Sequence, residues 1–223
     1  MTHAPHLCYK FHIMKFDNTR AQQSQILDEA ERMVLAEGHR RLRVTSVAHR
    51  LGMSHANVYR FFPNRRALIE AVGLRHLHGS LESVRQALTA PGTSLSRLES
   101  AAVALAKHRL RQESWGSHEL VAMLFAEDSP AVHQHLERHI ALFREALEQG
   151  VARGELVVQD APAAAEALMD ALTVVYHPAL PLHRSSTEHE QQARRIARWM
   201  ARAMAAPAVH DDSDNLGQGA SPS

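Results

Sequence analysis

Residues 44–68 read VTSVAHRLGMSHANVYRFFPNRRAL and predict two short helices joined by a tight turn. In the first helix apolar residues recur every three to four positions. Gly52 follows, a residue that readily adopts the left-handed conformation in which helices end. Ser54 is a favourable N-cap for a second helix over residues 55–62, and Pro63 ends that helix. This pattern indicates a helix-turn-helix, whose second helix reads DNA.

The second helix of this segment has one apolar and one polar face. At 3.6 residues per turn, Val58, Phe61 and Phe62 share one side, which suits a small core. The other side presents Arg60 and Asn57, whose side chains match guanine and adenine in the major groove. An ordinary amphipathic helix pair is the alternative interpretation, and this helix alone does not separate the two. The whole segment favours DNA binding.

Two kinds of DNA contact are expected from the segment. Arg60 and Asn57 are expected to read base edges, while Tyr59 suits a base or a phosphate equally. Arg43, Thr45 and Arg65 are expected to hold phosphates, which fix the register of the protein on DNA. The full set of expected DNA-binding residues is Arg43, Thr45, Ser54, His55, Ala56, Asn57, Tyr59, Arg60 and Arg65.

Specific positions within the segment carry a family resemblance. They are Val47, Ala48, the run LGMS at 51–54, the run VYRFFPNR at 58–65, Ala67 and Leu68. Through these positions the chain, over about residues 25–77, resembles the DNA-binding domain of the TetR family of bacterial repressors. Two positions depart from the usual pattern: Arg65 stands where Lys is usual, and Arg43 stands where Thr or Ser often caps a helix.

The resemblance implies an all-α protein with a three-helix N-terminal head and a six-helix C-terminal body. In the family the body binds a small-molecule inducer in a cavity formed by its second to fifth helices and forms a homodimer through its last two. The implied function is a repressor that binds a near-palindromic operator as a dimer and is released by an effector. The helix over 65–88 is expected to be the only connection that carries this signal to the head.

Composition bounds the class of protein. The chain has 223 residues, enough for one or two domains, and abundant Ala, Leu, Arg and Glu, which favour helices. Its single cysteine, Cys8, excludes an intrachain disulfide and fits the reducing cytoplasm, where we expect the protein to act. No apolar run approaches membrane-spanning length, so no membrane contact is expected.

Charge is distributed unevenly along the chain. Residues 1–70 contain eleven Lys and Arg but six Asp and Glu, whereas the remainder contains 14 and 18. A basic head on an acidic body implies that the head meets a polyanion. An accidental imbalance would explain the charge alone, but not its coincidence with the helix-turn-helix.

Apolar periodicity and breaks divide the chain into four parts. We expect a flexible N-terminal arm over residues 1–19, a DNA-binding head over 20–66, a helical ligand-binding and dimerisation body over 67–206, and a disordered tail over 207–223. Besides the helix-turn-helix, helices are expected at about 20–37, 65–88, 94–111, 116–127, 130–153, 161–177 and 187–206.

The last two expected helices carry stripes of small residues, which let helices pack closely. The resemblance assigns them to a dimer interface, although they could equally close the core of a monomer. The expected interface residues are Ala164, Ala167, Leu168, Ala171, Leu172, Val175, Ala193, Ile196, Ala197 and Met200.

The effector site is expected to combine apolar side chains with a few polar groups, as small-molecule pockets do. The candidate lining residues are His108, Trp115, Met123, Phe125, Phe143, Tyr176 and His177. For each of them an ordinary place in the core is the alternative. A DNA-binding helical protein without an effector is the corresponding alternative function.

No other chemistry is indicated. Among the 17 histidines, His135 and His139 lie one helical turn apart, a spacing that can share a metal, but no third ligand accompanies them. We therefore expect no metal and no cofactor, and keep a metal-responsive regulator only as an alternative. No catalytic motif is present, so an enzyme is not expected.

Overall fold

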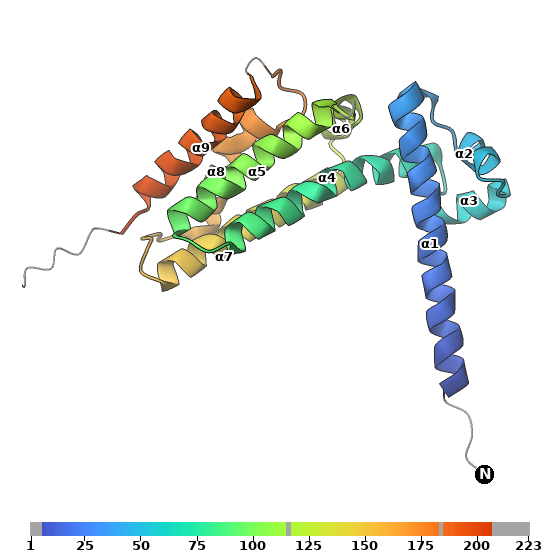
Figure 1. The fold of residues 1–223 in the computed structure, drawn as a ribbon, viewed down its shortest axis with the longest axis horizontal. Helices are drawn as coiled ribbons and strands as arrows, with labels where there is room; N and C mark the ends of the chain where they lie inside the picture. Colours follow the sequence, from blue (N-terminus) through green and yellow to red (C-terminus); the bar gives the residue numbers. More distant parts are fainter. Residues whose placement is uncertain (1–5, 115–116, 183–184, 207–223) are drawn as a thin grey trace, which may run out of the picture.

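The computed structural model describes residues 6–114, 117–182 and 185–206, and these are all-helical (Figure 1). The fold class predicted from the sequence is therefore confirmed. The helices are α1 (His6–Glu37), the 3₁₀-helix η1 (His39–Arg41), α2 (Val44–Arg50), α3 (His55–Phe61), α4 (Arg65–Thr89), α5 (Ser94–Ser114), α6 (His118–Ala126), α7 (Pro130–Ala152), α8 (Ala161–Tyr176) and α9 (Ser186–Ala203). From α4 onward, the expected bounds differ from these by no more than three residues at either end.

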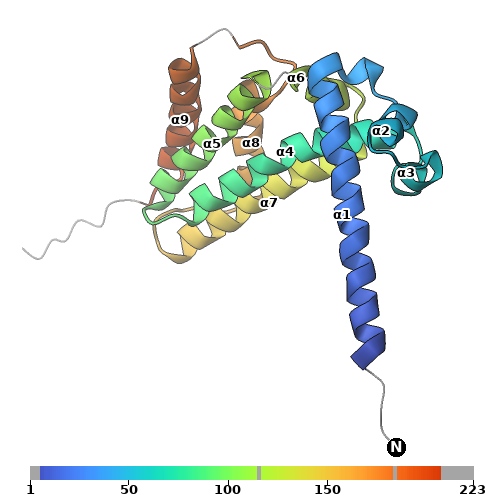
Figure 2. The same ribbon diagram turned by 45° about the vertical axis from the view of Figure 1, so that its right-hand side comes forward.

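The head consists of α1, α2, α3 and the first turns of α4. These helices enclose a small hydrophobic core of their own, which explains why the apolar residues of the helix-turn-helix recur at helical spacing. Its buried members include Ile26, Ala30, Leu42, Val47, Val58, Phe62, Leu68 and Val72. Figures 1 and 2 show the head at one end of the molecule, with α1 crossing it.

Helix α1 is longer than the sequence predicted. It begins at His6 rather than at residue 20, so residues 6–19 are helical where we expected a flexible arm. Its N-terminal half projects away from the rest of the chain (Figure 1). Extending an existing helix avoids the cost of nucleation, so this half needs no apolar periodicity to continue the packed half. Residues 1–5, like the predicted tail over 207–223, lie outside the described residues.

The body is built around α5, which packs between α4 and α9, and around α7, which packs on α4 and α8 (Figures 1 and 2). Its core is formed by apolar residues of all these helices, among them Leu98, Ala102, Phe143, Leu147, Leu168 and Leu172. Arg198 of α9 also binds Glu99 of α5 through hydrogen bonds of 2.6 and 2.9 Å. Helix α9 is therefore fixed to the same protomer through α5.

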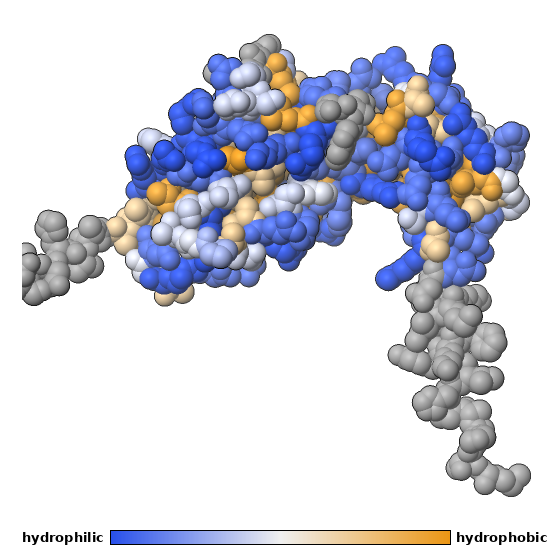
Figure 3. All heavy atoms as spheres, in the orientation of Figure 1, coloured by the Kyte–Doolittle hydropathy of each residue, from blue (hydrophilic) through white to orange (hydrophobic). Residues whose placement is uncertain are grey.

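The surface is mostly hydrophilic, with apolar side chains gathered at a few small places on the face shown in Figure 3. Within the described ranges, no helix has both the length and the apolar character that crossing a membrane requires.

Candidate DNA-binding and effector sites

The recognition helix α3 is delimited by a turn and a cap before it and by the cap of α4 after it. Gly52 has φ 62°, the left-handed conformation that the turn after α2 requires. Ser54 caps α3, because its hydroxyl accepts the Asn57 N–H at 3.2 Å. Asn64 caps α4 by accepting the Ala67 N–H at 2.8 Å. The turn and both caps predicted from the sequence are therefore present.

The two faces of α3 also agree with the prediction. Val58 and Phe62 are buried in the head core, and Phe61 packs against it. The outward face presents four exposed side chains, with Asn57 half-buried beside them; the four are His55, Ala56, Tyr59 and Arg60. This face has the donors, acceptors and small side chains that major-groove readout uses.

Arg60 has intrachain partners on this exposed face. Its guanidinium carbon lies 5.0 Å from the centroid of the Phe61 ring, a cation–π geometry, and its Nη2 donates to Gln22 Oε1 at 3.3 Å. Both contacts are at the surface, where such interactions contribute little energy and exchange readily. The side chain is therefore held close to the helix yet free to exchange these partners for a base.

The predicted phosphate contacts differ in accessibility. Arg43 and Thr45 are exposed around the start of α2, and Arg43 donates to the carbonyl groups of Arg40 and Leu42 at 3.1 and 3.2 Å. Arg43 is the N-cap residue of α2, but its side chain forms no capping hydrogen bond. The departure from the family pattern at this position thus leaves α2 without a side-chain cap.

Arg65 has a structural role that the sequence did not predict. Its half-buried guanidinium donates to the carbonyl oxygens of Leu42 and His39, both at 2.8 Å, and of Arg40 at 3.2 Å. These bonds join the start of α4 to η1 and to Leu42 directly after it. Since η1 itself was not predicted, no sequence signal could have indicated these acceptors.

The ten expected interface residues divide into two sets. Five are fully buried inside the single chain, so they cannot form the surface of a dimer interface; they are Leu168, Leu172, Val175, Ala193 and Ala197. For these five the assignment was wrong, and they close the monomer core. The other five are exposed or half-buried and remain candidates; they are Ala164, Ala167, Ala171, Ile196 and Met200.

The outward face of α8 and α9 also carries large apolar side chains that the small-residue stripe did not reveal. Trp199 is 72% exposed and Val174 is 49% exposed. Val174 shares one face of α8 with Ala167 and Ala171 because these residues are spaced by three, four and seven positions. Trp199 lies three positions after Ile196 on α9. A set of apolar residues on adjoining helices is typical of a protein–protein interface.

A small internal cavity lies where α4, α5, α6, α7 and α8 meet. Its volume is about 20 Å³. It is lined by Leu77, Ser80, Leu105, His108, Arg109, Gln112, Phe125, His135, Leu136, His139, Met169 and Tyr176. Apolar walls with a few convergent polar groups are the usual composition of a small-molecule site.

Three of the seven expected lining residues line this cavity: His108, Phe125 and Tyr176. His177 lies beside it, with its ring 4.9 Å from that of Phe125 in an edge-to-face arrangement. Phe143 is instead fully buried in the body core, and Met123 packs against the core of the head. Trp115 lies outside the described residues.

The polar lining includes residues that the sequence analysis missed, above all a buried histidine pair. His135 and His139 both approach the Ser80 hydroxyl, at 3.3 and 3.2 Å, and their rings are 4.5 Å apart. Their one-turn spacing was the available signal, but it had suggested a metal pair. Among the described residues, no group of three or more His, Cys, Asp or Glu side chains could hold a metal ion.

Burial sets the charge of these histidines. It lowers the pKa of His135 to about 3 and those of His108 and His139 to about 4, because burial penalises the charged imidazolium. All three are therefore neutral near pH 7, when they can act as hydrogen-bond donors and acceptors but not as cations.

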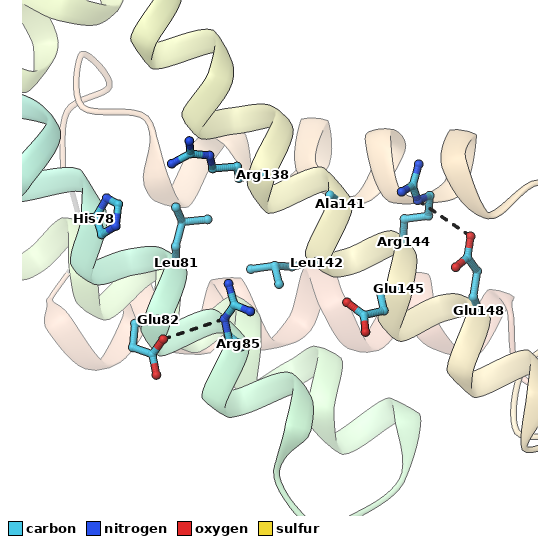
Figure 4. A pocket seen from close by; sticks show the side chains of 10 residues that line it. All are labelled: His78, Leu81, Glu82, Arg85, Arg138, Ala141, Leu142, Arg144, Glu145 and Glu148. Atoms are coloured by element: carbon cyan, nitrogen blue, oxygen red, sulfur yellow. Dashed lines mark ion pairs between the residues drawn. The ribbon is translucent and has the colours of Figure 1, made fainter. Parts of the chain in front are cut away.

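A larger groove, of about 610 Å³, lies on the surface between α4 and α7 (Figure 4). Charged side chains of both signs line it, with Arg85 paired to Glu82 and Arg144 to Glu148, each at 3.8 Å. Such pairs on one helix are ordinary features of a solvated surface. We therefore place the effector site in the smaller internal cavity, whose polar groups converge.

The cavity and the head are connected by more than α4. Leu120 of α6 is buried in the core of the head, and the Ser129 hydroxyl before α7 donates to Glu70 of α4. Arg75 of α4 also pairs with Asp28 of α1 at 2.5 Å. The expectation that α4 alone connects head and body was therefore wrong, because α6 packs on both.

The fold and the exposed face of α3 define a helix-turn-helix DNA-binding regulator with a helical body. Residues 26–72 match the family model of bacterial regulatory proteins of the tetR family, and residues 95–206 match a tetracyclin repressor-like C-terminal domain. The chain belongs to the TetR family of DNA-binding transcriptional regulators. A comparison with curated proteins gave no match.

Solved structures with this fold include several bacterial regulators. A TetR/AcrR-family regulator from Thermobifida fusca is 22% identical, with 80% of this chain and 97% of that chain covered and a TM-score of 0.61. RolR in complex with resorcinol is 18% identical, with coverages of 86% and 91% and a TM-score of 0.60. SmeT, the repressor of a multidrug efflux pump of Stenotrophomonas maltophilia, is 16% identical, with coverages of 86% and 94% and a TM-score of 0.58. At these identities the likeness concerns the fold.

Proposed function

We propose that this regulator is a repressor that binds a near-palindromic operator as a homodimer and is released when a small molecule enters the cavity of the body. The observation that carries the proposal is the path of α4. This one helix lines the cavity with Leu77 and Ser80, and buries Leu68 and Val72 in the core of the head. A ligand that displaces the cavity wall therefore acts on an element of the DNA-binding head.

The cavity supports an effector-driven change because it is nearly full. About 20 Å³ holds one water molecule, so any larger ligand must move the helices or side chains around it. By linkage, a ligand that lowers DNA affinity by some factor must itself bind DNA-bound protein more weakly by the same factor. In the same fold, RolR was solved with resorcinol and SmeT is a repressor, which is consistent with this function.

Dimerisation is proposed through the outward face of α8 and α9, which includes Trp199, Val174 and Ile196. Two-fold symmetry would place two α3 helices on successive major grooves, with half-sites separated by about 34–36 Å or a multiple of that distance. Arg60 and Asn57 would read base edges, and Arg43 and Thr45 would hold phosphates.

Selection from a randomised duplex library with the full-length protein tests this proposal, followed by footprinting of the selected DNA. The expected result is an inverted repeat protected on one face over two half-sites. Recovery of an asymmetric site by a monomer would refute dimeric recognition. Failure to enrich any sequence at low salt would refute the DNA-binding role assigned to α3.

A regulator without an effector is the second candidate, and the small size of the cavity favours it. The two are separated by screening metabolite-like compounds in a thermal shift assay and then measuring operator affinity. Compounds that bind the cavity but leave operator affinity unchanged would support the second candidate.

A further inference from the structure

The side chain of Arg109 lies in the wall of the internal cavity with much of its hydrogen-bonding capacity unused. It is only 2% exposed. Its Nη2 donates to Glu113 Oε1 at 2.8 Å, and to the carbonyl oxygens of Pro178 and Leu180 at 3.2 and 3.4 Å. Nε and Nη1 are buried without a partner among the described residues. Between them they carry three N–H groups, and buried donors of this kind are normally paired.

The surroundings of Arg109 make it the charged group of this cavity. Burial lowers the pKa of the lining histidines His108, His135 and His139 to about 4, 3 and 4, so they are neutral near pH 7. None of the other described lining residues is ionised at that pH, and none is a carboxylate. Glu113, which pairs with Nη2, is not part of the lining. The remaining N–H groups are therefore free to donate to an acceptor on a molecule inside the cavity.

The rest of the lining indicates the chemical character of the remainder of that molecule. Apolar side chains from five helices face the same space as Arg109; they are Leu77, Leu105, Leu136, Phe125 and Met169. A carboxylate offers about four acceptor positions, enough for the N–H groups of Nε and Nη1, and forms stronger hydrogen bonds with a guanidinium than a neutral oxygen does. Apolar walls favour a hydrocarbon or aromatic body attached to it.

We propose that the cavity binds a small organic monocarboxylate, whose carboxylate accepts hydrogen bonds from Arg109 and whose apolar body lies among the leucine, phenylalanine and methionine side chains. This inference rests on the proposed function, since it names the chemistry of the effector. Because the cavity holds about 20 Å³, binding must displace parts of the wall. Leu77 and Ser80 belong to that wall, so the displacement reaches α4.

Calorimetric titration of the full-length protein with three matched pairs of compounds tests the proposal. The carboxylates are benzoate, phenylacetate and hexanoate, and their neutral partners are benzyl alcohol, 2-phenylethanol and hexanol. At least one carboxylate should bind about tenfold or more tightly than its alcohol, because a charge-assisted bond replaces a neutral one. If every carboxylate binds no more tightly than its alcohol, the proposal is overturned.

Variants then locate the binding site. Arg109→Met should remove the preference for the carboxylate, and Arg109→Lys should keep part of it. Lys107→Met removes an exposed cation from the same helix, one that pairs with Glu190 at 3.6 Å, and should leave the preference unchanged. Equal loss of preference in Lys107→Met and Arg109→Met would overturn the assignment to the cavity. If Arg109→Met does not fold, Arg109→Lys and the wild-type preference decide the matter.

Separate measurement of DNA binding distinguishes the two proposals. A protein that selects an operator but shows no carboxylate preference keeps the proposed function and loses this inference. A protein that binds carboxylates through Arg109 without any change in operator affinity confirms the ligand class, and the release mechanism in the proposed function fails.

Discussion

Gly73 of α4 lies directly against the side chain of Leu124 of α6. A Cβ atom added at Gly73 would lie 2.2 Å from Leu124 Cδ1, far inside normal contact distance. A larger residue at this position therefore requires the Leu124 side chain to move. Helix α6 also buries Leu120 in the core of the head. The contact between Gly73 and Leu124 therefore lies where α6 links the body to the head.

Gly73→Ala should destabilise the protein. Leu124 is buried and has to shift to make room, and overpacking of this kind typically costs about 1–3 kcal/mol, more than the roughly 1 kcal/mol that Ala gains over Gly within a helix. Urea denaturation of the variant measures the loss. Operator binding should also change its response to ligand, because the contact between head and body is altered.

Gly79→Ala is a matched control on the same helix. There the added Cβ would lie 3.6 Å from His108 Cε1, an ordinary contact, so only the gain in helix propensity remains. The variant should be more stable by about 0.5–1 kcal/mol. Equal effects of the two substitutions would show that the α4–α6 contact is not tight.

Arg60→Ala should weaken operator binding and leave folding intact. Loss of a bidentate base contact typically costs about 1–3 kcal/mol and blurs preference at one base pair per half-site. The side chain's own contacts, to Phe61 and Gln22, are exposed, so the free energy of unfolding should change by less than about 0.5 kcal/mol. Gel shifts against single-substitution operators, with parallel denaturation curves, measure both.

Arg65→Ala should show the opposite pattern. Three carbonyl groups lose a charged donor, so unfolding should become easier by about 1–3 kcal/mol. Any loss of affinity should be about equal for all DNA sequences, since no base contact is removed. If Arg65→Ala is as stable as the wild type while sequence preference is lost, the two arginines have been assigned the wrong roles.

The contrast between these arginines shows what the sequence could predict. Turns and caps depend on local residue types, so Gly52, Ser54 and Asn64 indicated the helix-turn-helix correctly. The burial of Val58 and the exposure of Arg60 followed from helical periodicity. The acceptors of Arg65 lie in η1 and at Leu42 directly after it, more than twenty positions away in the chain, and no local pattern indicates such a contact.

The candidate sites of the body were harder to predict for a related reason. A stripe of alanines shows that a helix packs closely, but Ala fits a monomer core and a dimer interface equally well. Ala197 thus proved to be core, while the exposed Trp199 two positions later was not selected. From the sequence alone Arg109 would be expected at the surface, because charged residues are rarely buried. Only the arrangement of five helices places it in a cavity.

Trp199→Glu, combined with Val174→Glu, should convert the protein to a monomer without unfolding it. Both side chains are exposed in the single chain, so charge there is solvated in the monomer but buried and unpaired in a dimer. Light scattering coupled to size exclusion measures the oligomeric state, and far-ultraviolet circular dichroism the fold. Operator affinity should fall steeply, because a monomer binds one half-site whereas a dimer binds both half-sites at once.

Ala197→Glu provides the contrast on the same helix. Ala197 is fully buried in the monomer core, so this variant should unfold or lose several kcal/mol of stability rather than dissociate cleanly. A folded, monomeric Ala197→Glu protein would restore Ala197 to the interface. An unchanged dimer in the Trp199 and Val174 double variant would place the interface elsewhere.

The buried histidines should make the protein sensitive to mild acid. In the folded state burial holds the pKa of His135 near 3 and that of His139 near 4, whereas an unfolded histidine titrates at about 6.5. Between these values the unfolded chain binds protons that the folded chain does not, so stability is fully present above about pH 6.5 and declines as the pH falls. Each such histidine contributes a slope of at most about 1.4 kcal/mol per pH unit.

His135→Gln tests this origin of the acid sensitivity, because Gln can still bond the Ser80 hydroxyl but does not titrate. Free energies of unfolding, measured in urea at intervals from pH 7.5 to 4.5, should show a shallower decline for this variant than for the wild type. His133→Gln, at an exposed position of the same helix, controls for the loss of a histidine as such. If the two variants flatten the curve equally, or if neither does, burial of His135 is not what links stability to pH.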